Sequence, residues 1–285
     1  MDKGGRLGII AGRGRLPEYL ARAARNSGHD PLIIALKNEA DQDWSDYQCH
    51  TISIADLRAA SRLFVKYGID RIVMSGAVGR RPEWYEGRPT WRTIGRLPEV
   101  VGAVLGAGDD KLLRIMIKVL ESEGVRVISA QDIAPDLLTT LGPIGKHKPS
   151  QVDLRDVEAA KHAALTLGKL DIGQGAVSVG GRVVALEGLE GTDAMLQRVA
   201  SLRRSGRLSR KYPGVLVKMC KPAQDIRADL PSTGLVTIRE AKQAGLAGVA
   251  LEAGRSLLLD RQEAVELADQ EGLFILGIEA GEGGL

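Results

Sequence analysis

Apolar residues in the first half of the chain come in short runs separated by longer amphipathic stretches. Leu7–Ala11 and Pro31–Leu36 have the length of buried strands, whereas Leu57–Tyr67 repeats its apolar positions with helical spacing and is followed by Gly68. Short apolar strands that alternate with helices are typical of a parallel, doubly wound sheet. The pattern predicts strands over 7–11, 31–36, 51–54, 71–74 and 124–129, and helices over 16–27, 57–67, 97–105 and 109–123.

The second half combines the same alternation with a local hairpin. Two apolar runs, Ala176–Val179 and Arg182–Leu186, are joined by Gly180 and Gly181, and a two-glycine connection of this kind indicates a β-hairpin. We therefore expect a mixed α/β arrangement. Further strands are predicted over 214–218, 247–251, 256–259 and 273–277, and helices over 153–167, 193–202, 238–244 and 261–271.

A change in composition separates the two halves. The segment Thr139–Ser150 is rich in Gly, Pro and Lys and has little periodicity, as linkers do. A chain of 285 residues is also long enough for two domains. We predict an N-terminal Rossmann-like, nucleotide-binding domain over 1–138, a linker over 139–152, and a C-terminal mixed α/β catalytic domain over 153–285.

The amino-acid composition limits which classes of molecule the protein is expected to bind. Aromatic residues make up only 4% of the chain, which argues against a nucleic-acid surface built from stacking rings, and the net charge of +3 is far from that of a dedicated DNA-binding protein. We expect anionic small molecules as partners and no nucleic acid. Two cysteines far apart in sequence, together with apolar runs too short for a signal peptide or a membrane span, favour the cytoplasm.

The first candidate for ligand chemistry is the glycine-rich turn after the first predicted strand. Gly12, Gly14 and Leu16 precede Pro17, which suits the first turn of a helix. Such a turn can present backbone N–H groups to a phosphate or nucleotide. It can equally be a tight strand-to-helix connection with no ligand, and the sequence leaves both interpretations open.

A second small-residue loop follows the predicted strand over 71–74. It contains Gly76 and ends with Arg80 and Arg81. Ligands of doubly wound sheets bind at the carboxyl ends of strands, so this loop is expected to lie beside Gly12 and Gly14. The alternative is a surface loop with solvated arginines. Asp109, further along, suits a helix cap better than a metal ligand.

Carboxylates, glycines and lysines gather between Asp171 and Asp229, a stretch that contains no histidine. Such oxygen ligands suit Mg²⁺ or Mn²⁺ and phosphate-bearing substrates rather than zinc. Asp229 stands before Pro231 on a stiff segment, and it is the first candidate metal ligand and catalytic residue; Glu190 and Asp193 are further candidate ligands. Each acid alone can also be a solvated charge or a helix cap. Lys218 and Lys221 are candidates to neutralise phosphate oxygens.

Several of these runs together carry a resemblance that covers nearly the whole chain. The sequence resembles the LpxI family, most specifically in Asp-Ile-Gly-Gln-Gly and Glu-Gly-Thr-Asp-Ala-Met-Leu. The matching runs are Gly8–Pro17, Gly108–Arg114, Leu170–Val177, Glu190–Arg198, Arg227–Pro231 and Gly245–Val249.

The resemblance implies an enzyme of lipid A biosynthesis. Members are UDP-2,3-diacylglucosamine pyrophosphatases, so the expected reaction is Mg²⁺-dependent hydrolysis to UMP and 2,3-diacylglucosamine 1-phosphate (lipid X). It also implies a homodimer, peripheral contact with the inner face of the cytoplasmic membrane, and Asp229 as the catalytic aspartate. The candidate substrate-binding residues are Gly12, Gly14, Leu16, Gly76, Gln174 and Thr192.

Two alternatives to this hydrolase remain at the level of sequence. One is a different nucleotide-sugar enzyme, such as a transferase. The other is a non-catalytic nucleotide-binding or regulatory module, in which the acids are only structural.

Overall fold

The chain forms two compact units in a computed structural model that describes residues 5–79, 88, 90, 109–209, 211–222, 224–227 and 230–280. The first unit comprises Met1–Asp136 with Asp225–Asp229, and the second comprises Leu137–Gln224 with Leu230–Leu285. The helix expected over 97–105, the arginines at 80 and 81, and Asp229 itself lie outside the described residues.

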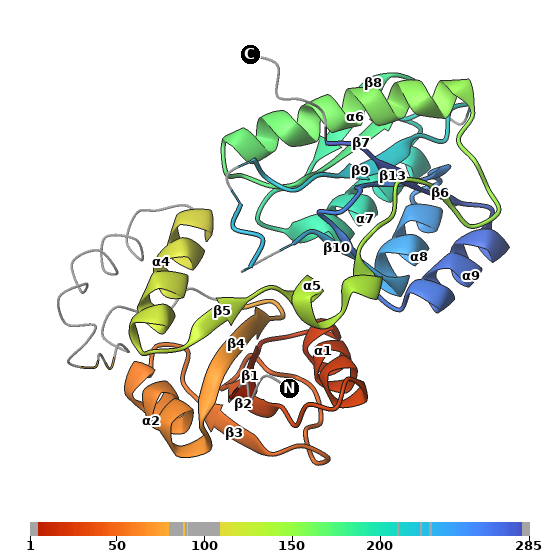
Figure 1. Ribbon diagram of the computed structural model, residues 1–285. Helices are drawn as coiled ribbons and strands as arrows, with labels where there is room; N and C mark the ends of the chain where they lie inside the picture. The colour runs from red at the N-terminus through yellow and green to blue at the C-terminus, as the bar shows by residue number, and fades with distance from the viewer. Residues whose placement is uncertain are drawn as a thin grey trace. The chain divides into compact units, whose positions relative to one another are not determined.

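In the described part of the first unit, the sheet has five parallel strands in the order β3-β2-β1-β4-β5 (Figure 1). The chain returns to the centre of the sheet between β3 and β4, and this reversal of strand order is characteristic of a doubly wound fold. The strands are β1 (Arg6–Ala11), β2 (Leu32–Leu36), β3 (Cys49–Ile52), β4 (Ile69–Ser75) and β5 (Arg126–Ile128).

Helices cover both faces of this sheet. On one face Phe64 of α2 and Ile117 of α4 pack with Leu32, Ile34 and Ile72 in a continuous core. On the other face α1 contacts both β1 and α5. The helices are α1 (Leu16–Asn26), α2 (Leu57–Tyr67), α4 (Asp109–Ser122) and α5 (Ala130–Ile133), followed by the 3₁₀ turn η3 (Pro135–Leu137).

The ends of α2 show why local sequence fixes its boundaries. Asp56 caps the helix by accepting the backbone N–H of Ala59 at 2.9 Å. Gly68 ends it in the left-handed conformation, with a φ of 62°. Glycine adopts that conformation without the steric cost that a Cβ would bring.

Among the described residues of the second unit, the sheet has six strands in the order β6-β13-β11-β9-β7-β8. Its three central strands are parallel, and β6, β7 and β8 add antiparallel pairs at the two sides. The strands are β6 (Gly142–Ile144), β7 (Gly175–Val179), β8 (Arg182–Leu186), β9 (Val215–Lys218), β11 (Gly248–Glu252) and β13 (Phe274–Ile278); β10 (Ser232–Thr233) and β12 (Leu257–Leu258) form a separate parallel pair.

Of the helices in the described part of this unit, a long one covers one face of the sheet and the others cover the opposite face (Figure 1). Val157, Ala160 and Ala164 of α6 pack on the central strands, whereas Met195 and Ile238 belong to the core beneath α7 and α8. The helices are α6 (Gln151–Lys169), α7 (Gly191–Arg204), α8 (Leu235–Gln243) and α9 (Arg261–Glu271).

The predicted fold class is confirmed: a parallel doubly wound sheet and a mixed α/β sheet follow each other along the chain. The predicted hairpin forms with Gly180 and Gly181 at φ values of 64° and 81°. The stretch that we expect from the sequence to be a linker, 139–152, contains β6, and its Ile144 is buried in the core of the second unit.

Candidate functional site

The carboxyl edge of the second sheet gathers several of the residues that the sequence singles out. β9 ends at Lys218 and β11 ends at Glu252, while the antiparallel β7 begins at Gly175. The register places Gly175 and Leu251 on either side of Lys218 in neighbouring strands. Loops from separate parts of the second unit therefore meet at one edge, where ligands of parallel sheets bind.

Lys218 is buried at this edge, with 4% of its surface exposed. Its Nζ donates to the backbone oxygen of Ser232 at 2.7 Å, its one acceptor among the described residues. A lysine ammonium has three donors, and a buried cation is costly unless it is compensated. The geometry therefore leaves donors of Lys218 for an anion, as its predicted role requires.

Lys221 has a different environment, because its Nζ forms an ion pair with Asp171 Oδ1 at 2.7 Å. Asp171 belongs to the Asp-Ile-Gly-Gln-Gly run and has a left-handed backbone, with a φ of 54°. The pair thus fixes that run to the segment after β9. Lys221 is brought to the same edge as Lys218, with much of its charge balanced by Asp171.

Glu187 connects two of the sequence runs and was not among the predicted site residues. Its carboxylate accepts the hydroxyl of Thr192 at 2.6 Å and the backbone N–H of Gln174 at 3.2 Å. A Cβ on Gly175 would lie 2.8 Å from Glu187 Oε2, so a side chain there would displace this carboxylate. The side-chain oxygen of Gln174 is buried and makes no hydrogen bond with a described residue, which leaves it available to a ligand donor.

Glu190 and Asp193, the two other predicted metal ligands, have separate partners. Glu190 forms an ion pair with Arg198 at 2.9 Å, and Asp193 accepts the hydroxyl of Thr237 at 3.2 Å. Within the described ranges, no three His, Cys, Asp or Glu residues are grouped so that they could hold one metal ion. The described carboxylates alone therefore do not fit a Mg²⁺ site, and the metal prediction depends on Asp229, which is not described.

Glu252 is a further buried group that sequence reasoning missed. It is 1% exposed, accepts the backbone N–H of Cys220 at 2.7 Å, and pairs with Arg255 at 3.2 Å. Burial raises the pKa of Glu252 above its ordinary value, and the Cys220 N–H and Arg255 oppose that rise. The sequence feature that could have identified Glu252 is its position directly after a predicted buried strand.

Gln224 completes the turn after β9. Its side-chain oxygen accepts from the backbone N–H of Lys221 at 3.0 Å and from the thiol of Cys220 at 3.2 Å. The backbone after β9 is thus held from two sides, by Glu252 and by Gln224. This arrangement fixes the direction in which residues 218–221 leave the sheet.

In the first unit, the two predicted glycine loops lie against each other. Arg13 and Ala77 exchange two backbone hydrogen bonds of 2.8 and 3.0 Å. A Cβ on Gly12 would lie 2.5 Å from Ala77 O, and one on Gly76 would lie 2.6 Å from Arg13 O. Close packing of the two backbones therefore explains these glycines without a ligand.

The N–H groups of the first loop already have acceptors within the protein. Gly12 donates to Ser75 O at 2.8 Å, Arg13 to Ala77 O, and Gly14 to Asp41 Oδ1 at 2.9 Å. Gly14 has a φ of 90°, and the space where its Cβ would stand is open. A ligand role for Gly12, Gly14 and Gly76 stays a prediction, as does that of Leu16, the first residue of α1.

The segment before Asp229 is described as far as Arg227. Arg227 donates to Asp225 at 2.8 Å and to Glu121 of α4 at 3.0 Å. The hydrogen bond and charge of Arg227 lower the pKa of Asp225 below its ordinary value, although partial burial acts in the opposite direction. This segment belongs to the first unit, with an ordered ion-pair network two positions before Asp229.

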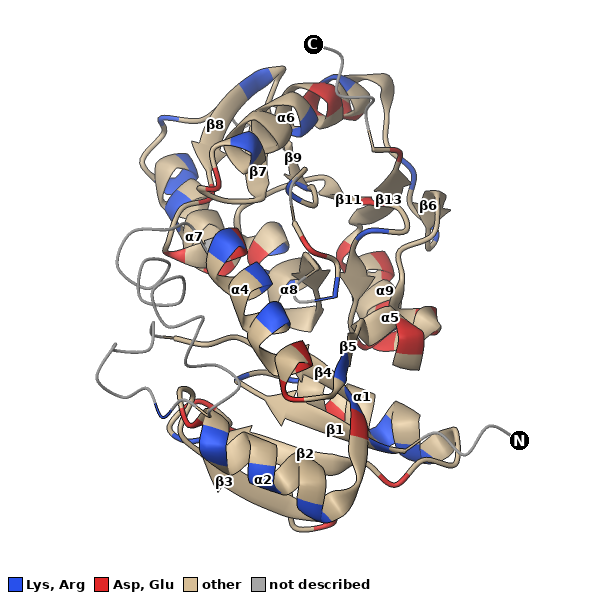
Figure 2. Cartoon of the chain, turned by 60° about the vertical axis from the view of Figure 1, so that its left-hand side comes forward, with Lys and Arg blue, Asp and Glu red and all other residues tan. Residues whose placement is uncertain are grey.

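Charged residues of both signs are interspersed over the helices of each unit (Figure 2). Such a distribution is unlike the single basic stripe that follows a nucleic-acid backbone. None of the helices in the described part of the chain has the length and hydrophobicity needed to cross a membrane.

Two protein-family models match the chain, one over most of each compact unit. A family model described as the LpxI N-terminal domain matches residues 6–137, and one described as the LpxI C-terminal domain matches residues 140–276. The UDP-2,3-diacylglucosamine pyrophosphatase LpxI of Caulobacter vibrioides is 38% identical over 279 residues, which are 97% of this chain and 99% of that protein. Among solved structures, "Crystal structure of a putative epimerase from Burkholderia cenocepacia J2315" is 14% identical, with a TM-score of 0.27 over 97% of this chain and 84% of that one.

Proposed function

Because this chain belongs to the LpxI family, we propose that it hydrolyses the pyrophosphate bond of UDP-2,3-diacylglucosamine, giving UMP and 2,3-diacylglucosamine 1-phosphate. The observation that carries the proposal is the similarity to the Caulobacter pyrophosphatase, which extends over both units and 97% of the chain. The reaction belongs to lipid A biosynthesis.

The carboxyl edge of the second sheet supports an anionic substrate. Lys218 is buried with donors to spare, and phosphate oxygens are acceptors of the matching charge. A cation in a site with little water stabilises charge that develops on phosphate oxygens more strongly than it would in bulk water. In this proposal Lys218 binds the pyrophosphate, and Lys221 with Asp171 holds the surrounding loop in place.

Gln174 and Thr192 have different parts in the proposed site. The side-chain oxygen of Gln174 has no described partner and would accept an N–H or O–H of the substrate. The hydroxyl of Thr192 already donates to Glu187, so Thr192 positions Glu187 and the adjoining backbone. Both residues thereby act at the edge where Lys218 is buried.

Mg²⁺ or Mn²⁺ is the proposed cofactor. Such an ion would polarise a phosphoryl oxygen and neutralise charge, and Mg²⁺ is commonly held by one or two carboxylates together with substrate phosphates. Asp229 is the proposed ligand and catalytic residue, with Glu190 and Asp193 as the further candidates. The described partners of Glu190 and Asp193 are Arg198 and Thr237, and those contacts would have to be exchanged for the metal.

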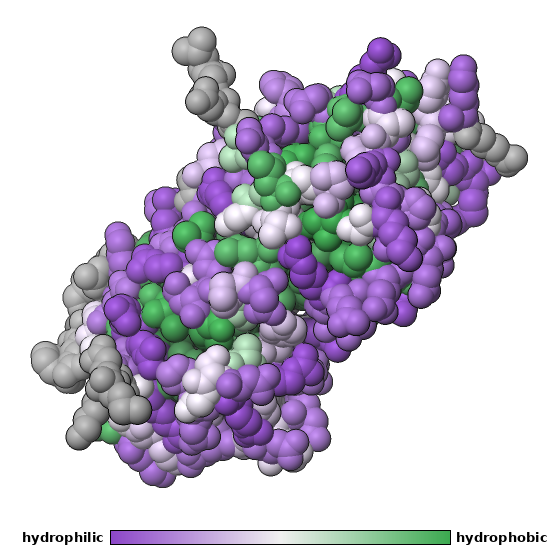
Figure 3. All heavy atoms as spheres, turned by 45° about the vertical axis from the view of Figure 1, so that its right-hand side comes forward, coloured by the Kyte–Doolittle hydropathy of each residue, from purple (hydrophilic) through white to green (hydrophobic). Residues whose placement is uncertain are grey.

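The proposal includes contact with a membrane surface, because the substrate carries two acyl chains. Figure 3 shows apolar side chains that reach the surface among hydrophilic ones. Four exposed apolar residues lie within or close to the two specific sequence runs: Leu170, Ile172, Leu186 and Leu189, the last of them fully exposed. We propose that the protein is cytoplasmic, associates peripherally with the inner face of the cytoplasmic membrane, and forms a homodimer.

The test is an assay of the purified protein with UDP-2,3-diacylglucosamine in detergent and Mg²⁺, with and without EDTA. We expect release of UMP in the presence of Mg²⁺ and its loss on chelation, with recovery when Mg²⁺ is restored in excess. Tight binding of the substrate without UMP release would favour a non-catalytic module instead. Release of UMP that EDTA leaves unchanged would keep the hydrolase and refute the metal dependence.

A further inference from the structure

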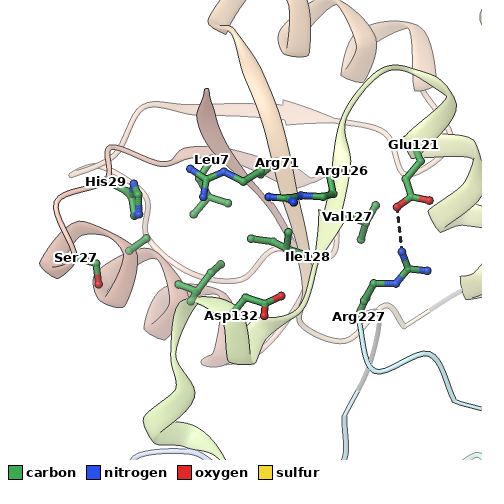
Figure 4. A pocket seen from close by; sticks show the side chains of 12 residues that line it. Leu7, Ser27, His29, Arg71, Glu121, Arg126, Val127, Ile128, Asp132 and Arg227 are labelled. Atoms are coloured by element: carbon green, nitrogen blue, oxygen red, sulfur yellow. Dashed lines mark hydrogen bonds and ion pairs between the residues drawn. The ribbon is translucent and has the colours of Figure 1, made fainter. Parts of the chain in front are cut away.

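A pocket of about 590 Å³ lies in the first unit, on the sheet face that α1 and α5 cover (Figure 4). It is lined at the amino ends of β1, β4 and β5, by Leu7, Arg71 and Arg126 among others. The Gly12 and Gly76 loops follow the opposite ends of the same strands. The pocket is therefore separate from the edge at which a doubly wound sheet ordinarily binds its ligand.

Two arginines occupy directly opposed positions in this pocket. Arg71 of β4 and Arg126 of β5 are partners in the parallel register, and Leu7 of β1 is the partner of Arg71 on its other side. Figure 4 shows the Arg71 and Arg126 side chains projecting from their strands toward the same side. Like charges on neighbouring strands repel each other, and an anion bound between them would relieve this repulsion.

Compensation of these two guanidinium groups within the protein is incomplete. Arg71 forms a long ion pair with Asp70 at 3.5 Å and donates from one terminal nitrogen to Gly5 O at 3.3 Å, but its Nε is buried without a hydrogen bond. The other oxygen of Asp70 accepts the backbone N–H of Gly5. No ion pair or hydrogen bond of the Arg126 side chain is found among the described residues. The space between the two side chains is thus positive and open to the pocket.

The acidic residues of the lining have other partners. Glu121 is paired with Arg227 at 3.0 Å, as the dashed line in Figure 4 shows. Asp132 accepts from the backbone N–H and the hydroxyl of Ser129 at 2.8 and 2.7 Å, and thereby caps α5. Neither carboxylate neutralises Arg126, and His29 adds a further polar ring to the lining.

We propose that this pocket binds a phosphate-bearing small molecule. Its phosphate oxygens would lie between Arg71 and Arg126, since guanidinium groups match phosphate geometry with two parallel hydrogen bonds. The less polar part of the ligand would lie against Leu7 and Ile128, which also line the pocket. The volume is within the usual range for small-molecule sites, roughly 300–1,000 Å³.

The phosphate can come from two sources, a separate metabolite or the nucleotide part of the enzyme's own substrate or product. Arg227 lines the pocket and stands two positions before Asp229 in sequence, so an occupant would contact the segment that leads to that residue. The inference itself depends only on the geometry of the first unit and does not require the proposed hydrolase activity.

The test is isothermal titration of the full chain with pyrophosphate, in the presence and absence of saturating UMP. Arg126→Met removes one guanidinium from an exposed position, and Arg62→Met on α2 is the matched control because Arg62 is also exposed and does not line the pocket. A hydrogen bond to a charged group contributes about 1.5–3 kcal/mol, so we expect roughly 10- to 100-fold weaker binding in Arg126→Met. Arg62→Met should bind like the wild type.

A second variant, Asp132→Asn, should change the affinity for pyrophosphate in the opposite direction, because it removes a negative charge from the lining and keeps an acceptor for Ser129. It should bind pyrophosphate more tightly than the wild type. If UMP leaves the binding unchanged, the ligand is a separate metabolite, whereas competition by UMP together with sensitivity to Arg126→Met identifies the enzyme's own nucleotide. Absence of binding by the wild type, or equal affinity of Arg126→Met and Arg62→Met, would overturn the proposal.

Discussion

Replacement of Lys218 by Met is the most informative single change at the carboxyl edge of the second sheet. Methionine retains the length of the lysine stem in a site that is 4% exposed, and removes the ammonium that donates to Ser232 O. Loss of one preorganised donor to developing charge typically lowers kcat by about 10²–10³-fold, or roughly 2.7–4 kcal/mol. We expect a loss of that size in UMP release.

Stability should change much less than activity in Lys218→Met. The lost charged hydrogen bond costs about 1.5–3 kcal/mol, but the variant no longer buries an ammonium, a penalty of several kcal/mol. These two contributions oppose each other, so urea denaturation should show a small net change of either sign.

The matched control for Lys218→Met is Lys169→Met, which removes an exposed lysine at the end of α6 in the same unit. This variant should release UMP at the wild-type rate. If Lys218→Met retains kcat and kcat/KM within about threefold of the wild type, a difference of only about 0.7 kcal/mol, the assignment of Lys218 to the pyrophosphate is refuted.

Three further predictions concern stability. Gly12→Ala should lower the free energy of unfolding by about 1–3 kcal/mol, because its Cβ would lie 2.5 Å from Ala77 O. In Gly28→Ala the new Cβ has no close neighbour, so the cost comes only from the strain of a positive φ. Urea denaturation measures the free energy of unfolding of both variants. The pKa of Asp225 is below its ordinary value of 3.8 in the folded protein, so the stability that its ionised carboxylate contributes is present above that pH and lost below it. Asp225→Asn should therefore lower the free energy of unfolding at neutral pH, and the difference from wild type should vanish in acid. Burial raises the pKa of Glu252 above 4.5, so Glu252→Gln should gain stability relative to wild type as the pH rises through that pKa; an opposite slope in denaturation at several pH values would contradict this.

Elements with strong local signals could be predicted closely from the sequence. The helix predicted over 261–271 has those same bounds in α9, because Gly272 ends it in a left-handed conformation with a φ of 73°. α6 begins two residues earlier than predicted, since Ser150 and Asp153 form a capping box around its first turn. Boundaries fixed by side-chain caps require recognition of the cap, and hydrophobic periodicity alone does not supply it.

The features that the sequence did not reveal depend on long-range pairing. β6 has only three residues, and it is a strand because Gly142–Ile144 pairs with β13 more than 130 positions away. Glu252 likewise becomes notable only when β9 and β11 are neighbours, since its carboxylate then accepts the N–H of Cys220. A single sequence contains no local signal for pairing between residues so far apart in the chain.

The glycine loops show the opposite problem, a local signal with two physical causes. Gly12 and Gly76 are required where two backbones approach closely, and Gly14 is required by its positive φ. A glycine-rich turn that holds a phosphate has the same composition. Composition alone therefore could not show whether these glycines are required by the fold or by a ligand. The N–H groups of Gly12 and Gly14 already have acceptors within the protein, which favours the structural cause.

The central claim, that this chain hydrolyses UDP-2,3-diacylglucosamine with Asp229 as its catalytic residue, is tested most directly by single-turnover release of UMP from wild type and Asp229→Asn in Mg²⁺. Loss of a carboxylate that holds a catalytic metal removes several kcal/mol of charge stabilisation, so Asp229→Asn should be slower by roughly three or more orders of magnitude, with an unchanged circular dichroism spectrum. Release of UMP by Asp229→Asn at a rate close to that of the wild type, or no release of UMP by the wild type itself, would contradict the account.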